Sequence, residues 1–365
     1  MRINPHTKPK KKVAIFLGAG ASAADGAPIQ SNIFRDYFNS LKRRKPSKEH
    51  EHELVAFFKK MFDIDVLYKN LDNINFPTFE EALGILDLAD LKNEAFKELS
   101  NINLEVNSGR IKFLRLYLLF LMADIINEKL QKPDTLHRVL VNNLSKDQLD
   151  QTTFLTTNYD ILCDNALYYL NRFETNYKKV DYGVEFIDYR NGTFERPNDN
   201  SIKLLKLHGS LNWLHCPVCN NLHITPNEKG VYRMMTNLDS MRCENCQGVY
   251  SPIIIPPTFY KDMSKVYLGQ VWNVAEAELL NTNHLIFCGY SFPDADIHIK
   301  YLIKRIQKNR NPKNELKVTI INNHDDKEQS IKDEEKNRYQ RFLGKNINYT
   351  DLSFKDFANN PLQII

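Results

Sequence analysis

Five short apolar runs, each followed at once by small or polar residues, constrain the fold of this chain more than any other feature. The runs cover residues 13–17, 153–155, 204–207, 285–288 and 318–321. Short apolar runs that alternate with helical stretches are typical of the buried strands of a parallel sheet. Since open parallel sheets bind ligands beyond the carboxyl ends of their strands, we expect the residues after the five runs to form one site.

This order of strands and helices predicts an α/β fold built on a Rossmann-like parallel sheet. About 110 residues of mainly helical pattern separate the first two runs, which is too long for an ordinary crossover. They include a capping-box pattern at Thr78–Glu81 and an expected helix over residues 108–130. We interpret residues 32–148 as a helical insertion. The other expected parts are a Rossmann-like domain at residues 1–31, 149–212 and 251–324, a cysteine-bearing module at 213–250, and a C-terminal helical segment at 325–365.

Composition excludes several classes of protein. The chain has 365 residues, of which 42% are hydrophobic, enough for a substantial core. Its net charge of +4 is too small to favour direct binding of nucleic acid, which we do not expect. No apolar stretch reaches the ~20 residues of a membrane span, and residues 1–12 are too polar for a secretory signal. We therefore expect a soluble cytoplasmic protein without membrane contact, and its six cysteines do not suggest a disulfide framework.

The residues after the first run match a dinucleotide-binding fingerprint. Gly18-x-Gly20-x-x-Ala23 directly follows the expected strand, which is the context that this fingerprint requires. Its glycines permit a tight turn and a close approach of the backbone to a pyrophosphate. A purely structural glycine turn is the alternative. An ordinary dehydrogenase would also carry an acidic residue at the end of the next strand, about 20 residues on, and this chain has none there.

Four cysteines have the spacing of a structural zinc site. They form two C-x-x-C pairs, Cys216 with Cys219 and Cys243 with Cys246. Two such pairs supply the four thiolates of a tetrahedral Zn²⁺ site, which leaves no open position for catalysis. We therefore expect a structural Zn²⁺, with His215 and His223 as competing ligands that four sulfurs make unnecessary.

Asn158 and His208 are the polar residues after the second and third runs that best suit catalysis. A histidine has a pKa near neutrality, and the glycine that follows His208 leaves it little steric cover. The alternative for His208 is a hydrogen-bonded core histidine. The alternative for Asn158 is the N-cap of a helix that begins there.

Together these motifs resemble those of the sirtuin family, over almost the whole chain. Sirtuins combine a Rossmann-like domain with an inserted helical module and a small zinc ribbon, so the resemblance implies this fold, with residues 213–250 as the ribbon. The matching motifs, in the family's order, are Gly18-Ala19-Gly20-Ala21-Ser22, Thr156-Thr157-Asn158-Tyr159-Asp160, His208-Gly209, the two cysteine pairs, Gly289-Tyr290-Ser291 and Ile321-Asn322.

The resemblance implies that NAD+ is the substrate. Asn158 would orient the ribose and the attacking water, His208 would accept a proton, and Asp160 would contact the nicotinamide amide. The NAD+-binding residues that it implies are Gly18, Ala19, Gly20, Ser22, Tyr159, Gly289, Ser291 and Asn322.

Departures from the deacylating sirtuins narrow the expected function. Ile29 and Ser31 stand where those enzymes carry an acidic residue and an arginine, and Arg35 is a candidate replacement for the arginine. Pro256 and Pro257 remove backbone donors where an acyl-lysine peptide would add as a strand. Divergent bacterial proteins that resemble sirtuins in this way are often NAD+ hydrolases of anti-phage defence. They commonly act with a partner, such as an ATPase or an Argonaute-like protein.

The resemblance therefore predicts an NAD+ glycohydrolase that releases nicotinamide and ADP-ribose, as a regulated, homo-oligomeric effector of antiviral defence. Two alternatives stay open: an NAD-dependent protein deacylase, and a non-catalytic sensor of NAD+ or ADP-ribose. Incubation with NAD+ alone separates the three, because only a hydrolase releases nicotinamide without an acylated peptide.

Overall fold

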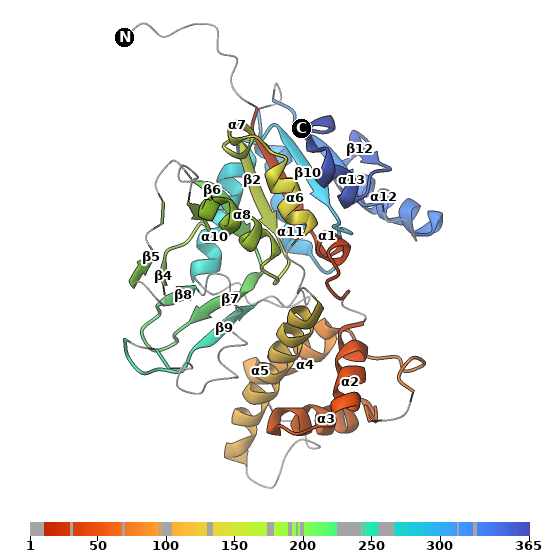
Figure 1. Cartoon of the computed structure of the whole chain (residues 1–365), viewed down its shortest axis with the longest axis vertical. Helices are drawn as coiled ribbons and strands as arrows, with labels where there is room; N and C mark the ends of the chain where they lie inside the picture. Colours follow the sequence, from red (N-terminus) through yellow and green to blue (C-terminus); the bar gives the residue numbers. More distant parts are fainter. Residues whose placement is uncertain are drawn as a thin grey trace, which may run out of the picture.

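A parallel sheet covered by helices on both faces forms one half of the molecule in the computed structural model, with a helical body and a smaller sheet beside it (Figure 1). The structure describes residues 11–29, 32–67, 70–94, 96, 104–129, 134–173, 179–188, 192–194, 196–197, 201–224, 242–243, 245–254, 266–311, 314–323 and 327–365.

The main sheet has the strand order β12-β11-β10-β1-β2-β6-β3, and all neighbouring strands are parallel. Its strands are β1 (Val13–Leu17), β2 (Thr152–Thr156), β3 (Val180–Asp181), β6 (Ile202–Lys206), β10 (His284–Cys288), β11 (Lys317–Ile321) and β12 (Ile347–Thr350). The predicted α/β fold is confirmed, and the five apolar runs are β1, β2, β6, β10 and β11. Leu17 lies level with Thr156 and with Cys288, so the motifs after these three strands meet at one edge of the sheet.

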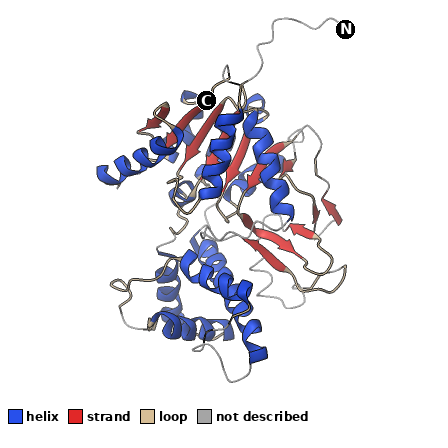
Figure 2. Ribbon diagram, turned by 180° about the vertical axis from the view of Figure 1, so that it is seen from behind, coloured by secondary structure: helices blue, strands red, loops and turns tan. Residues whose placement is uncertain are grey.

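Helices cover both faces of this sheet (Figures 1 and 2). One face carries α1 (Ala19–Ala24), α6 (Leu136–Asn142), α8 (Leu162–Phe173) and α13 (Phe354–Asn359), with the short α7 (Lys146–Leu149) before β2 and the 3-10 turn η4 (Pro361–Gln363) after α13. The other face carries α10 (Val266–Leu280), α11 (Ile297–Asn309) and α12 (Gln329–Leu343). Apolar side chains from both layers and from all of the strand interiors form one core.

The helical insertion has its own core. The insertion consists of α2 (Ile33–Arg44), α3 (Glu49–Phe62), α4 (Phe79–Lys92) and α5 (Leu104–Lys129). The predicted capping box starts α4, where Thr78 and Glu81 exchange side-chain and backbone hydrogen bonds. Leucines and phenylalanines are the commonest residues of this core, and Phe58 packs edge-on against Phe34 and Phe38.

The expected end of the insertion at residue 148 is too late. Helices α6 and α7 pack into the core of the main sheet through Leu140, Val141 and Leu149. Sequence periodicity identifies an amphipathic helix but does not indicate which of two neighbouring cores its apolar face contacts, so the boundary was not readable from the pattern.

The second sheet has the order β5-β4-β8-β7-β9. Its strands are β4 (Phe186–Asp188), β5 (Gly192–Phe194), β7 (Gly209–His215), β8 (Leu222–Ile224) and β9 (Ser251–Ile254). The cysteine-bearing module expected at 213–250 is therefore part of a larger unit, because β4 and β5 join it from earlier in the chain. Leu211 of β7 and Ile254 of β9 also enter the core of the helical insertion, so this sheet contacts that insertion directly.

The C-terminal segment expected at 325–365 is not purely helical. It contains the helix α12, but it then adds β12 as the edge strand of the main sheet. Tyr339 and Phe357 are fully buried in the core of that sheet. The segment is thus part of the Rossmann-like domain rather than an appendage. Strand β12 escapes prediction because its residues are at most half-buried and lack a continuous apolar run.

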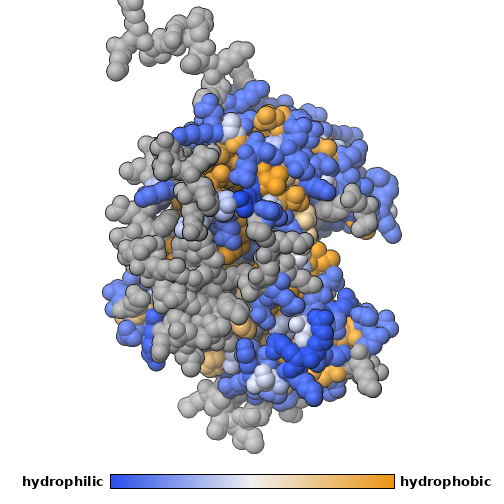
Figure 3. Space-filling view, viewed as in Figure 1, coloured by the Kyte–Doolittle hydropathy of each residue, from blue (hydrophilic) through white to orange (hydrophobic). Residues whose placement is uncertain are grey.

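Among the described residues, no helix is both long and apolar enough to cross a membrane. Figure 3 shows one face of the molecule as mainly hydrophilic, with separate apolar spots, and its outline is indented between the main sheet and the helical insertion.

Acid is expected to destabilise the fold through His284, at the first position of β10. Its Nε2 lies 2.8 Å from Thr319 Oγ1, and burial, assisted by Lys317 and Lys11, lowers the pKa of His284 from 6.5 to about 4. The unfolded chain therefore binds this proton at a higher pH than the folded chain. Stability from the neutral ring is complete above pH 6.5 and is lost as pH falls toward 4.

We expect this effect to reach about 2 kcal/mol near pH 5 and about 3 kcal/mol near pH 4. Urea unfolding of the parent and of His284→Gln, measured from pH 7 down to about pH 5, checks it. The parent should lose more stability than the variant over this range. Equal slopes in the two proteins would contradict the assignment to His284.

Candidate active site

Two glycine turns cross in contact at the carboxyl edge of the main sheet. The Gly20 N–H donates to the Gly289 carbonyl at 2.7 Å, and the Gly18 N–H donates to the Cys288 carbonyl at 2.9 Å. A Cβ at Gly18 would lie 2.6 Å from the Gly289 oxygen. Gly289 has φ +61°, and a Cβ there would lie 2.1 Å from the Ala21 nitrogen. Both positions therefore require glycine for packing, whether or not a phosphate binds beside them.

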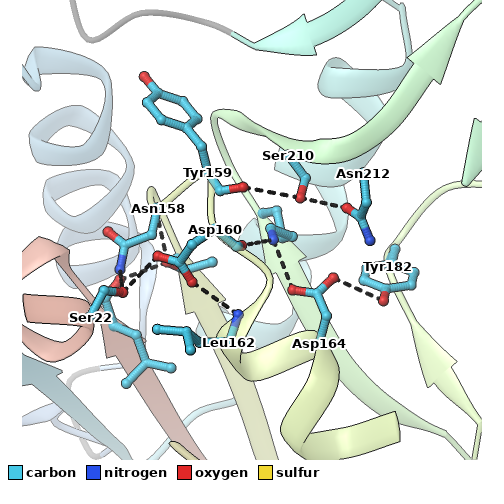
Figure 4. Close-up of polar contacts among 12 residues, drawn as sticks. Ser22, Asn158, Tyr159, Asp160, Leu162, Asp164, Tyr182, Ser210 and Asn212 are labelled. Carbon is cyan, nitrogen blue, oxygen red and sulfur yellow. Dashed lines mark hydrogen bonds and ion pairs between the residues drawn. The ribbon is translucent and has the colours of Figure 1, made fainter. Parts of the chain in front are cut away.

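Asn158, Ser22 and Asp160 form one hydrogen-bond network next to this crossing (Figure 4). Asn158 Nδ2 donates to the Gly18 carbonyl and to Ser22 Oγ, both at 2.8 Å. Ser22 Oγ donates in turn to Asp160 Oδ2 at 2.7 Å. The network joins the first and second motifs, which sequence order alone places far apart. Since a carbonyl accepts but cannot donate, the Gly18 contact also fixes which end of the Asn158 amide is nitrogen.

The N-cap alternative for Asn158 is wrong. Helix α8 begins at Leu162, and the Leu162 N–H donates to Asp160 Oδ1 at 3.0 Å. Asn158 lies in the preceding loop, where its own N–H donates to Thr156 Oγ1 at 2.9 Å. Its side chain is thus held toward the glycine turn that starts α1 and not toward the first turn of α8.

His208 follows β6 and is 1% exposed. The backbone of the preceding residue, Leu207, is held on both sides: its N–H donates to the Thr156 carbonyl, and its carbonyl accepts from Trp272 Nε1, both at 2.9 Å. The glycine that follows has φ +80° and lies against β9, where a Cβ would meet the Ile253 carbonyl. Gly209 is therefore needed for the chain to turn from one sheet into the other directly after His208.

Asp296 is a site residue that the sequence did not indicate. It is the N-cap of α11 and is 3% exposed, and its Oδ1 lies 4.0 Å from His208 Nε2. Its other oxygen accepts from the Tyr290 hydroxyl at 2.6 Å. A buried carboxylate next to a histidine stabilises the protonated ring, which a histidine that accepts a proton requires. Asp296 follows Gly289 by seven residues and is not part of a recognisable motif, so nothing in the sequence marks it as a site residue.

Lys206 is a second residue that the sequence did not indicate. It ends β6 two positions before His208 and is 0% exposed. Its ammonium donates to the Asp160 carbonyl at 2.5 Å and to Asp164 Oδ2 at 2.8 Å. A lysine between the leucines of the run 204–207 is unusual, and this was the signal that could have identified it.

Tyr159 points away from the network. In Figure 4 its ring projects to the opposite side of the loop from Asp164, and it packs against the core of the helical insertion. Burial raises the pKa of Tyr159 well above 10, with Glu80 and Asp296 adding to the effect, so the phenol stays protonated at neutral pH. The residue thus links the active-site loop to the insertion.

Ser291 and Asn322, both expected to contact NAD+, lie at the ends of β10 and β11. The Ser291 carbonyl accepts from Arg338 of α12 at 3.1 Å. Asn322 is 2% exposed, and its Nδ2 donates to Glu335 Oε2 at 2.5 Å. Helix α12 therefore covers this end of the site, and Asn322 is already engaged with it.

The candidate replacement arginine has another role. Arg35 donates to the carbonyls of Leu71 and Ile74 at 3.3 and 3.1 Å, so it holds a loop of the helical insertion. Ile29 is 48% exposed. Ser31, Pro256 and Pro257 lie outside the described residues.

The four cysteines of the predicted zinc site come together. Their sulfurs all lie within 4.8 Å of one another, and the group forms a small apolar cluster with Leu214 and Tyr250. Burial raises the pKa of Cys216, but N–H donors from Cys219 and Val218 outweigh it and bring the pKa to about 7, which favours a thiolate. Four sulfurs at this spacing fit a tetrahedral metal ion. Cys163 and Cys288 are buried elsewhere, as expected.

Comparisons with known proteins agree with this architecture. A family model described as "SIR2-like domain" matches residues 152–348, more than half of the chain. No curated protein sequence matches significantly. Similar solved structures include one of Sir2 with the inhibitor EX-527, 2'-O-acetyl-ADP-ribose and a deacetylated p53 peptide, at 14% identity and a TM-score of 0.40 over 96% of this chain and 93% of that one. Another is a Sir2 homolog–NAD complex, at 13% identity and a TM-score of 0.41 over 97% and 89%. At these scores the likeness is too distant to transfer any contact.

Proposed function

Because the chain belongs to the SIR2-like family, we propose that it is an NAD+ hydrolase that cleaves the nicotinamide–ribosyl bond. The reaction consumes one water and yields nicotinamide, ADP-ribose and a proton. One observation carries the proposal: Asn158 and Asp160 are joined through Ser22 at the sheet edge where the glycine turns cross. This network holds two polar side chains of the second motif directly beside a turn suited to a diphosphate.

The resemblance to the sirtuins and the position of each group at the sheet edge support the proposed binding roles. Backbone atoms of Gly18, Ala19 and Gly20, with Gly289 and Ser291, line the diphosphate, and Tyr159 borders the site from the helical insertion. Ser22 is 3% exposed and bonded to both Asn158 and Asp160. Ser22 therefore acts mainly by holding these two side chains in place, and only to a lesser extent by contacting the phosphate. Asn322, which is also buried and is bonded to Glu335 of α12, lies at the end of the site that we assign to the adenosine ribose.

Asn158 has a defined chemical role in this mechanism. Both hydrogens of its amide are used, one on the Gly18 carbonyl and one on Ser22 Oγ. The remaining function of the side chain is acceptance by Oδ1, which can hold a water or a ribose hydroxyl through its hydrogen. Asp160 adds negative charge and faces the carboxamide of the nicotinamide.

The barrier lies in the sugar cation that forms as neutral nicotinamide departs, as in glycoside hydrolysis. The leaving group is already a cation, so departure needs little acid. His208 accepts the proton of the attacking water or of a ribose hydroxyl. Asp296, 4.0 Å from His208 Nε2, stabilises the imidazolium that results.

The test is nicotinamide release from NAD+ by the purified protein without any peptide, at several protein concentrations. We expect nicotinamide and ADP-ribose in equal amounts, at a rate on the order of 1 s⁻¹ or above once the active assembly forms. An acylated peptide should not accelerate the reaction. Release that requires such a peptide would instead establish a deacylase, and NAD+ binding without turnover would establish a sensor.

We further propose that the protein acts in the cytoplasm as an antiviral defence effector. Free NAD+ hydrolysis would be toxic if unregulated, so control by homo-oligomer assembly, or by an ATPase or Argonaute-like partner, is part of the proposal. It rests on the departures from the deacylating sirtuins at Ile29 and Ser31.

A further inference from the structure

The loop that carries Asn158 and Asp160 is held by residues on both sides of His208. The Tyr159 carbonyl accepts from the Leu211 N–H at 2.9 Å. The Ser210 hydroxyl, which donates to Asn212 Oδ1 at 2.6 Å, lies 3.5 Å from the same carbonyl. The next carbonyl, that of Asp160, accepts from Lys206 Nζ at 2.5 Å. Two consecutive carbonyls of the loop are therefore bonded by one short segment, and His208 lies within that segment.

Lys206 is supported by a buried polar network of its own. Asp164 Oδ2 accepts from the ammonium at 2.8 Å, and Asp164 Oδ1 accepts from the Tyr182 hydroxyl at 3.0 Å (Figure 4). Lys206, Asp164 and Tyr182 are 0%, 5% and 6% exposed. Both charges are thus removed from water, which costs free energy that the ion pair recovers incompletely.

Stability alone does not account for such a network. Apolar residues of similar volume often replace a buried ion pair with no loss of stability. An apolar strand end would, however, leave the Asp160 carbonyl without the donor that Lys206 supplies. The contact that an apolar replacement cannot reproduce is the one that joins β6 to the active-site loop.

We propose that Lys206 is a positioning residue that sets the spacing between His208 and the Asn158–Asp160 loop, with Asp164 and Tyr182 fixing its ammonium. The inference rests on the proposed function, in which His208 and Asn158 act on the same ribose. Its effect extends beyond one carbonyl, since Asp160 is bonded to Ser22 and Ser22 to Asn158. Displacing Asp160 therefore also displaces the amide that orients the water.

The test replaces the whole network by apolar residues, in the variant Lys206→Met/Asp164→Leu/Tyr182→Phe. Changing all three together avoids an unpaired buried charge, so the fold should persist. We expect the melting temperature to stay near that of the parent. The kcat for nicotinamide release should fall ~10- to 100-fold, with a smaller change in KM, because the reacting groups are misplaced rather than lost.

Hydrogen exchange supplies a readout that needs no turnover. In the triple variant the amides of residues 158–161 should exchange ~10-fold faster than in the parent, as expected for a loop that has lost a tether. The matched control is Lys203→Met, on the same strand, whose ammonium lies 3.3 Å from Glu278 and far from the loop. This control should match the parent in both exchange and kcat.

Unchanged exchange at residues 158–161 together with an unchanged kcat would overturn the positioning role and leave Lys206 purely structural. A parent protein that never hydrolyses NAD+ would overturn the proposed function instead, while exchange still tests the tether. If the triple variant does not fold, Tyr182→Phe keeps the ion pair and removes one support of Asp164. Faster exchange at residues 158–161 in that variant supports the inference, and parental exchange overturns it.

Discussion

Replacing His208 with alanine is expected to lower kcat for nicotinamide release by roughly 100- to 10,000-fold, the usual contribution of a general base. The ring is 1% exposed and lies near the Asp296 carboxylate, so it is placed to accept a proton and to keep it. Single-turnover measurements of nicotinamide release, normalised to the folded fraction, provide the test. His208→Gln, which retains size and polarity without a basic nitrogen, should show the same loss.

The matched control for this prediction is His284→Gln. His284 is also buried but starts β10, at the opposite end of a strand from the site. Its loss should alter the acid stability described above and leave kcat near the parental value. A His208→Ala protein that consumed NAD+ as fast as the control would show that another group accepts the proton.

Replacing Cys243 with serine is expected to remove bound zinc and to destabilise the second sheet by on the order of 4 kcal/mol, within the range of losses seen when a structural metal is removed. Cys243 is fully buried within the four-sulfur cluster. Strand β7 links that cluster to the site, because it begins at Gly209, directly after His208. Loss of the metal should therefore also reduce nicotinamide release, and not stability alone.

Zinc content by elemental analysis and the thermal unfolding midpoint check this prediction. The parent should carry about one zinc per chain. Cys163→Ser is the control, since Cys163 lies in α8 and is buried away from the cluster. It should keep the parental zinc content even if it unfolds at a lower temperature. Parental zinc content in Cys243→Ser would mean that the four cysteines do not form the metal site.

Much of the fold was readable from local patterns. The ends of five strands fall within two residues of the ends of the apolar runs: β1, β2, β6, β10 and β11. These strands were predictable because a strand that is buried on both faces has a mainly apolar sequence. Strands β3 and β12 escaped prediction. One has two residues and the other is at most half-buried, so neither carries such a run. The predicted end of the helical insertion was also inaccurate, because α6 was assigned to the insertion but packs on the main sheet.

Some residues of the candidate site were likewise predictable from local patterns, and others were not. Asn158 and His208 were predicted because strand ends of a parallel sheet converge, Asp160 was predicted from the resemblance to the sirtuins, and the cysteine pairs were predicted because their spacing suits one metal ion. Ser22 was expected at a phosphate, yet it bonds to Asp160, 138 positions along the chain. Lys206 and Asp296 were not expected, since each acts through residues that are distant in sequence.

The sequence was sufficient to predict which segments become buried strands, which residues follow them, and that two cysteine pairs could share a metal. These properties depend on periodicity and spacing over a few neighbouring residues. Tertiary contacts, in contrast, set which side chains of distant motifs bond to one another and which core each helix joins. A hydrogen bond or an ion pair depends on the separation of atoms in space, and no local pattern records that separation for residues brought together by folding.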